Sequence, residues 1–297
     1  MEFWLTILEQ GFIFGVMALG VYITYRILDF PDLSVDGSFP LGAAVAASFL
    51  QSGANPIFAT AMSFGAGMIA GCMTGILHTK LKITNLLSSI LVMIALYSIN
   101  LRIMGKSNIP LFKQKTIFSN NWDSIYTIII IAVFMKIALD LFLRTKLGFV
   151  LKATGDNPKL ITSLGIDIGT IKIMALMIAN GLVALSGAMM AQHQRFADVG
   201  MGTGVMVMGL ASIILGETVL KSIPFISATT MAIIGSILYK ASTAFALKLG
   251  FPATDLKLIT AIIVVIALSL RHNKLKLPFK LGTSLGGETN ATSTQSI

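Results

Sequence analysis

Long apolar runs recur along this chain and constrain its fold more than any other feature. An α-helix needs about 20 mostly apolar residues to cross the hydrocarbon of a bilayer. Every backbone polar group inside hydrocarbon must be bonded within the protein, and these runs do not alternate as the strands of a membrane barrel do. Only 12% of the residues are charged, whereas soluble domains carry roughly 25%. The sequence therefore predicts an all-α fold, a polytopic transmembrane helical bundle.

About nine segments are expected to span or enter the membrane. They are residues 11–28, 39–51, 56–77, 85–101, 122–143, 169–192, 202–215, 223–247 and 253–270. The segments 39–51 and 202–215 are too short for a full crossing, which predicts broken helices beside a cavity unless their ends extend further. Residues 1–282 are expected to form one transmembrane domain, with a disordered polar tail at 283–297.

The basic residues lie in loops between the apolar runs, so the net charge of +9 favours contact with membrane lipid and no binding of nucleic acid. Nine crossings place the basic clusters at 80–82, 144–159 and 271–280 on one side. Because short cytoplasmic loops are rich in Lys and Arg, that side is expected to be the cytoplasm. The prediction is a multi-pass protein of the bacterial inner membrane with its N-terminus outside and its C-terminus cytoplasmic. The basic loop 102–115 then falls outside, against the rule.

Several kinds of site are unexpected in this chain. Cys72 is the only cysteine, which excludes an internal disulfide, and the three histidines are too far apart in sequence to favour a metal site. Gly105, Lys106 and Ser107 resemble the end of a phosphate-binding loop, but Asn100 stands where that loop needs a glycine. We therefore expect no metal, no cofactor and no catalytic residue.

The polar loop 144–168 interrupts the membrane pattern and carries the strongest local signal. Asp156 is expected to cap a short helix, Pro158 fits its first turn, and Gly165 can end it in a left-handed conformation. This surface helix either rests on anionic lipid or docks on an ATPase as a coupling helix. The expected coupling residues are Lys152, Thr154, Gly155, Asp156, Asn157, Pro158, Lys159, Leu160 and Gly165.

Polar residues within or beside the spans are candidates for a transport pathway. Asp29, Asp32 and Asp36 lie close together beside a short segment, where carboxylates are costly unless they face water or a partner. Two interpretations are open: these aspartates line the inner mouth of the transport pathway, or they belong to a solvated loop. Polar residues within the predicted spans either face the transport pathway or form hydrogen bonds to neighbouring helices. The expected pathway residues are Asp32, Ser34, Asp36, Ser38, Asn85, Ser89 and Asn180.

Glycines at four-residue spacing predict close packing between helices. Gly67, Gly71 and Gly75 share one face of a predicted helix, so a neighbouring helix can approach that face closely. Gly181 and Gly187 suggest a second close contact.

Two motifs give the chain a resemblance to a known family. The run GFVLKATGDNPKLITSLGIDIGTIKI (148–173) resembles the cytoplasmic loop of permease subunits of ABC importers for branched-chain amino acids and ribose-type sugars. The run PDLSVDGSFPLGAAVAAS (31–48) resembles their DLSVG segment, with an additional Asp36 between Val35 and Gly37. No counterpart of the additional first helix of sugar-type members is expected. Both differences favour the shorter amino-acid branch, and the chain is similar to its members assigned to aromatic amino-acid import.

The resemblance implies a permease subunit that forms the translocation pathway of an ATP-driven importer for an amino acid or similar small polar solute. It implies ATPase subunits that carry ATP and Mg²⁺, and a second permease copy, with a homodimer expected. It also implies an external solute-binding protein, which would meet Gln194, Arg195 and Asp198.

The alternative is a secondary transporter or channel, which needs carboxylates in mid-span. Glu217 is the nearest candidate, but it is predicted at a helix end. A membrane-embedded enzyme ranks last, because no predicted helix presents a His/Glu or paired-Asp arrangement.

Overall fold

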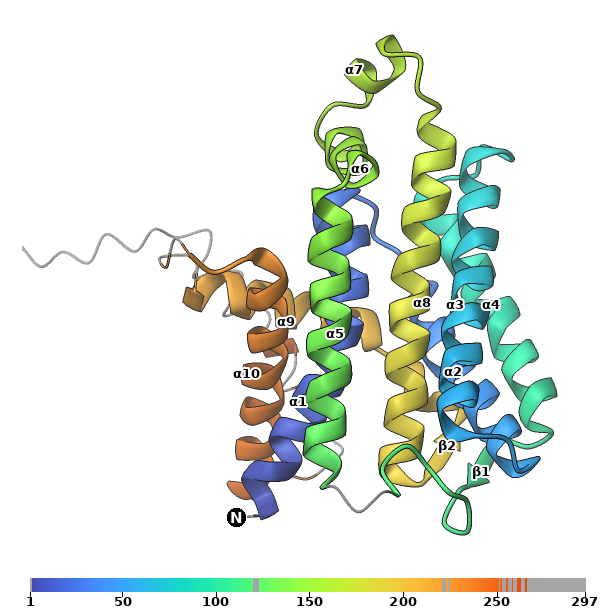
Figure 1. Cartoon of the computed structure of the whole chain (residues 1–297), viewed down its shortest axis with the longest axis vertical. Helices are drawn as coiled ribbons and strands as arrows, with labels where there is room; N and C mark the ends of the chain where they lie inside the picture. Colours follow the sequence, from blue (N-terminus) through green and yellow to red (C-terminus); the bar gives the residue numbers. More distant parts are fainter. Residues whose placement is uncertain are drawn as a thin grey trace, which may run out of the picture.

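The computed structural model describes residues 2–119, 123–220, 223 and 225–250, with isolated positions 252, 255, 258, 261, 262 and 265. Helices make up nearly all of this part of the chain (Figure 1). They are α1 (Glu2–Val21), the π-helix Tyr22–Ile27, α2 (Val35–Gln51), α3 (Pro56–Thr79), α4 (Asn85–Met104), α5 (Ser124–Arg144), α6 (Lys146–Asp156), α7 (Pro158–Ser163), α8 (Ile168–Gln194), the 3-10 helix Val199–Gly202, α9 (Val205–Leu220) and α10 (Ala228–Lys248).

The predicted transmembrane helical bundle is confirmed, and the predicted number of about nine segments is approximate. Among the described residues, 7 helical segments are long and apolar enough to cross a membrane, one of which joins the 3-10 helix to α9. α2 has 17 residues and falls short of a full crossing, as the sequence predicted. The segment predicted at 202–215 instead extends to Val199–Leu220, whose 22 residues are enough to cross. Most of the predicted ninth segment, 253–270, and the whole tail, 283–297, lie outside the described residues.

Helix α1 begins at Glu2 and the first span at Phe3, both earlier than the predicted residue 11. Glu9 interrupts the apolar run in sequence, which made the earlier residues look unsuited to a span. In the fold, Oε2 of Glu9 lies 3.0 Å from Nε2 of His193 at the far end of α8. The carboxylate therefore enters the bundle with a partner, and α1 runs unbroken past it.

The glycine row predicted on one helix packs that helix, α3, against α8. A methyl group added at Gly67 or Gly71 would meet the backbone oxygens of Asn180 and Leu176. Gly187 of α8 makes a similar approach to the backbone of Phe39 in α2. α8 thus lies at the centre of the bundle, in contact with α1, α2 and α3 and buried along most of its length.

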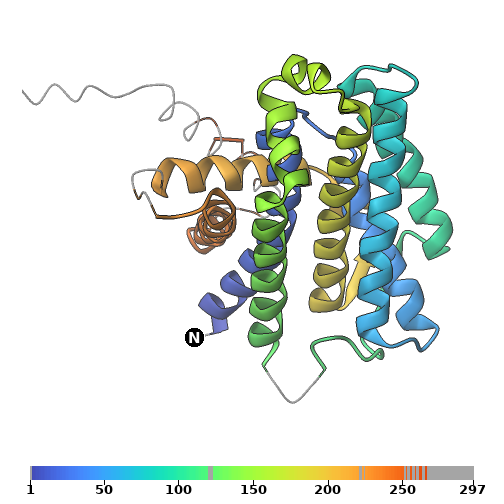
Figure 2. The same ribbon diagram turned by 45° about the horizontal axis from the view of Figure 1, so that its top comes forward.

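The bundle has two distinct ends (Figures 1 and 2). One carries α6, α7 and the α3–α4 connection with Lys80 and Lys82. The other carries the N-terminus and two short strands, β1 (Asn108–Pro110) and β2 (Phe196–Asp198), which pair antiparallel. The basic loop 102–115 reaches this second end, away from Lys80, as the predicted order of spans requires. α9 lies across the direction of α5 and α8 (Figure 2).

Candidate functional site: a protruding helical segment and a buried polar cluster

The predicted surface helix exists, but a different residue caps it. α7 begins at Pro158, and Oδ1 of Asn157 accepts a hydrogen bond of 3.2 Å from the Leu160 amide. Asp156 instead ends α6, so its predicted capping role is wrong. Proline disfavours a helical conformation in the residue before it, which leaves Asn157 extended (φ −148°, ψ 84°) and free to cap. Gly165 adopts the predicted left-handed conformation with φ +75°.

We call residues 146–165, which comprise α6, α7, Leu164 and Gly165, the coupling segment, after the coupling residues predicted there. The segment is fixed at its base and exposed at its tip. A methyl group on Gly155 would strike the backbone oxygen of Ile27, so α6 rests directly on the end of the first span. Leu160 and Leu164 are 52% and 64% exposed at the tip, which protrudes beyond the bundle (Figure 1).

The other predicted coupling residues divide between these two environments. Thr154 is buried, with its hydroxyl donating to the Val150 carbonyl oxygen at 2.8 Å, and Gly155 is half-buried. The exposed ones are Lys152, Asp156, Asn157, Pro158, Lys159 and Gly165.

Four of the predicted pathway residues meet in one buried cluster between the start of α2 and the middle of α8. Nδ2 of Asn180 donates to Oδ2 of Asp32 at 2.8 Å, and the Ser38 hydroxyl donates to Oδ1 of Asn180 at 2.6 Å. The amide and hydroxyl of Ser34 both donate to Oδ1 of Asp32. All four side chains are at most 1% exposed, so this carboxylate is desolvated and held by donors from α8 and from Ser34, the residue before α2.

The other predicted pathway residues lie apart from this cluster. Asp36 accepts hydrogen bonds from the amides of Gly204 (2.9 Å) and Met206 (2.7 Å), so it caps the start of α9. On α4, the hydroxyl of Ser89 donates to the backbone oxygen of Asn85, one turn earlier. Asp29 is exposed, with φ +50°.

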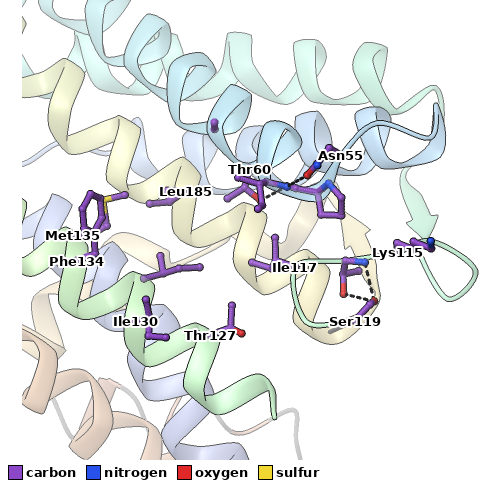
Figure 3. A pocket seen from close by; sticks show the side chains of 15 residues that line it. Asn55, Thr60, Lys115, Ile117, Ser119, Thr127, Ile130, Phe134, Met135 and Leu185 are labelled. Carbon is purple, nitrogen blue, oxygen red and sulfur yellow. Dashed lines mark hydrogen bonds between the residues drawn. The ribbon is translucent and has the colours of Figure 1, made fainter. Parts of the chain in front are cut away.

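A cavity of about 880 Å³ lies between α3, α5, α8 and the loop before α5 (Figure 3). Asn55, Lys115 and Ser119 line one end of it, whereas Phe134 and Met135 line the other. None of the predicted pathway residues lines this cavity. Its lining is drawn from helices far apart in sequence and carries no spacing pattern that could have indicated it.

Besides Glu9 and His193, two pairs of oppositely charged side chains lie within the described bundle. Nε of Arg26 lies 3.1 Å from Oε1 of Glu217, and Nζ of Lys136 lies 2.9 Å from Oδ2 of Asp140. Glu217, the carboxylate that a secondary transporter would need, is therefore engaged by a cation of the first span. No group of three metal-ligating side chains occurs among the described residues.

Comparison with known proteins identifies the family. The family model for the permease component of branched-chain amino acid transport systems matches residues 3–268. The chain belongs to this family. The permease is 53% identical over 273 residues to the tyrosine transport system permease protein of Clostridioides difficile, covering 92% of each chain. It is 24% identical over 219 residues to the ribose import permease protein of Escherichia coli, covering 71% of this chain and 68% of that one.

A solved structure shares the fold of the permease. PsaBC from Streptococcus pneumoniae in complex with Fab matches with a TM-score of 0.54 and 12% sequence identity, covering 88% of this chain and 89% of that chain. The permease is thus a multi-pass membrane protein and the membrane component of an ABC importer, not itself the catalytic component.

Proposed function

We propose that separate ATPase subunits drive this permease by binding the coupling segment. The observation that carries the proposal is the contrast between its base and its tip. Gly155 leaves no space between α6 and the end of the first span, so movement of α6 must move that span. Leu160 and Leu164 expose apolar surface that the bundle does not cover. An apolar tip on a rigid base suits docking into a groove of a partner.

The orientation follows from this docking. In this orientation the end of the bundle that carries the coupling segment and the α3–α4 connection, with Lys80 and Lys82, faces the cytoplasm of a bacterial cell. The end that carries the N-terminus, β1 and β2 faces outward. Positive charge in the short loops at the coupling end supports this assignment. ATP and Mg²⁺ bind the ATPase subunits. A solute-binding protein meets the outer end at Gln194, Arg195 and Asp198, and a second permease copy completes the pathway, forming a homodimer surrounded by lipid.

The substrate that we propose is an amino acid with a large apolar or aromatic side chain. The 53% identity to a tyrosine transport permease supports this class. The 880 Å³ cavity supports it independently, because Lys115 at its polar end suits a carboxylate while Phe134 and Met135 suit a ring (Figure 3).

The coupling proposal is tested with Leu160→Glu, which charges the exposed tip. Since Leu160 is 52% exposed, folding and insertion should be unchanged. We expect copurification of the ATPase in mild detergent and ATP-driven uptake both to fall at least about tenfold, as when a charge enters an apolar interface core. The matched control is Phe112→Glu, a residue 73% exposed at the opposite end, which should leave ATPase copurification unchanged. Normal uptake and copurification in Leu160→Glu would refute the proposal.

The substrate proposal is tested by competition and by Phe134→Ala. Tyrosine and phenylalanine should each inhibit uptake of the other. Phe134→Ala should reduce the uptake of these two amino acids more than it reduces the uptake of leucine. An equal loss of uptake for tyrosine, phenylalanine and leucine would contradict the proposed substrate class. Inhibition of uptake by ribose alone would contradict it as well. Copurification of the ATPase distinguishes failure of the substrate proposal from failure of the coupling proposal, because only the coupling proposal predicts its loss in Leu160→Glu.

A further inference from the structure

The π-helix Tyr22–Ile27, at the end of the first span, lies between the coupling segment and α9. A methyl group on Gly155 of α6 would strike the carbonyl oxygen of Ile27, so α6 rests on the end of this π-helix. From the same π-helix, Nε of Arg26 lies 3.1 Å from Oε1 of Glu217, near the end of α9. Because π-helical turns within α-helices occur often at functional sites, this connection suggests a role beyond packing.

The ion pair of Arg26 and Glu217 is a contact that the membrane should keep closed. The side chain of Glu217 is 13% exposed and that of Arg26 is 47% exposed. Both belong to helical segments that are long and apolar enough to cross a membrane. Separating the two charges would leave each of them unpaired in surroundings where an unpaired charge is costly. A displacement of the π-helix is therefore expected to carry the end of α9 with it.

The start of α9 is joined to the start of α2. The amides of Gly204 and Met206 donate to the carboxylate of Asp36 at 2.9 Å and 2.7 Å. Between its two ends, α9 passes close to α1, since a methyl group on Gly209 would press on the side chain of Val21. α9 is thus held by the π-helix at one end and holds α2 at the other. The start of α2 contributes to the buried polar cluster, so α9 connects the coupling segment to the interior of the bundle.

We propose that Arg26 and Glu217 are positioning residues that transmit movement of the coupling segment to α9, and through α9 to the start of α2. This inference rests on the docking of ATPase subunits proposed above. It is supported by a contiguous series of direct contacts, from Gly155 through Ile27 and the ion pair to Asp36. Neither charged residue lies in the coupling segment or lines the cavity of about 880 Å³. Loss of the pair should therefore leave binding of the ATPase intact while it abolishes the response of α9.

The test reports movement of α9 and does not depend on the identity of the solute. Cys72 is the only cysteine, so Cys72→Ala with Val207→Cys gives a single labelling site near the start of α9, where Val207 is 45% exposed. This parent, labelled with an environment-sensitive fluorophore, is purified with its ATPase and reconstituted in nanodiscs. We expect ATP with Mg²⁺ to change its fluorescence. Arg26→Met and Glu217→Gln should each reduce that change at least about fivefold, with ATPase copurification as in the parent.

Two further variants separate transmission from a general loss of stability. The double variant Arg26→Glu with Glu217→Arg exchanges the charges and should restore most of the fluorescence change, because it re-forms the pair. Lys136→Met is the matched control. Nζ of Lys136 lies 2.9 Å from Oδ2 of Asp140 one turn along α5, so this variant also loses an ion pair, but one within a single helix. Its fluorescence change should equal that of the parent.

Several results would overturn the inference. One is a parent that does not respond to ATP although the ATPase copurifies. Another is a response equal to that of the parent in Arg26→Met and Glu217→Gln. An equal loss in Lys136→Met, or a charge-exchanged variant no better than the single ones, would also overturn it. Failure of the ATPase to copurify with the parent would instead refute the docking proposal, and this inference with it.

Discussion

Asn180 and Asp32 are 148 positions apart in sequence, yet Nδ2 of Asn180 donates a hydrogen bond of 2.8 Å to Oδ2 of Asp32. The pair joins the centre of α8 to the start of α2. The same asparagine accepts from the hydroxyl of Ser38 through Oδ1, so one amide connects the cluster. A carboxylate in this buried position is stabilised chiefly by such donors.

Asn180→Leu should therefore lower the free energy of unfolding by about 1–3 kcal/mol, since it leaves Oδ2 of Asp32 without its amide donor. The midpoint of unfolding in mixed detergent measures this loss. Asn85→Leu is the matched control, because Asn85 is partly exposed at the start of α4 and lies outside the cluster; its effect should stay within about 0.5 kcal/mol. Similar losses in both variants would contradict a specific role for the cluster.

Two glycines of α3 should respond in opposite directions to the same substitution. Gly71→Ala forces a methyl group against the backbone of Leu176 and should cost about 1–3 kcal/mol. Gly65→Ala meets no atom within 4 Å and should stabilise the helix by about 0.5–1 kcal/mol. Unfolding midpoints of the two variants provide the comparison, and a stable Gly71→Ala protein would show that α3 and α8 can separate without loss.

Asp36→Ala should loosen the start of α9. The substitution removes the acceptor of the Gly204 and Met206 amides, which should cost about 0.5–2 kcal/mol. Hydrogen exchange at these two amides should accelerate, while exchange in the middle of α8 stays slow. Asp36→Asn keeps one oxygen acceptor and should have a smaller effect. Unchanged exchange at Met206 in Asp36→Ala would show that this carboxylate does not cap α9.

Asp167 should make the start of α8 sensitive to acid. The Thr170 hydroxyl and the Gly169 amide donate to its carboxylate and hold the pKa of Asp167 below its usual value of 3.8. Because the pKa is lowered in the folded state, the stabilising contribution is present above the usual value and is lost as the pH falls through the lowered one. Carboxyl NMR chemical shifts over an acid titration measure the pKa.

Thr170→Val should return the pKa of Asp167 toward its usual value, because it removes the strongest donor. Thr162→Val is the control, since the Thr162 hydroxyl donates to the Pro158 carbonyl oxygen instead. An unshifted titration in Thr170→Val would assign the lowered pKa to another cause.

Structural features that depend on residues close together in the sequence were predictable from the sequence. Runs of apolar residues predicted the helical bundle, and the short apolar run at 39–51 predicted the short helix α2. Local stereochemistry also predicted the left-handed Gly165, since glycine has no Cβ to oppose a positive φ. The cap of α7 was missed by one residue, because Asp156 and Asn157 are both good caps and only the backbone before Pro158 distinguishes them.

The sequence indicated that Asp32, Ser34, Ser38 and Asn180 enter the bundle, because each lies within or beside an apolar run. It could not determine which of them meet. Asp32, Ser34, Ser38 and Asn180 form one cluster, whereas Asp36 caps α9. The tertiary structure decided this grouping because hydrogen bonds require separations of about 3 Å. Only the close approach of helix backbones, permitted by the absent side chains of Gly67, Gly71 and Gly187, brings residues so distant in sequence to that separation.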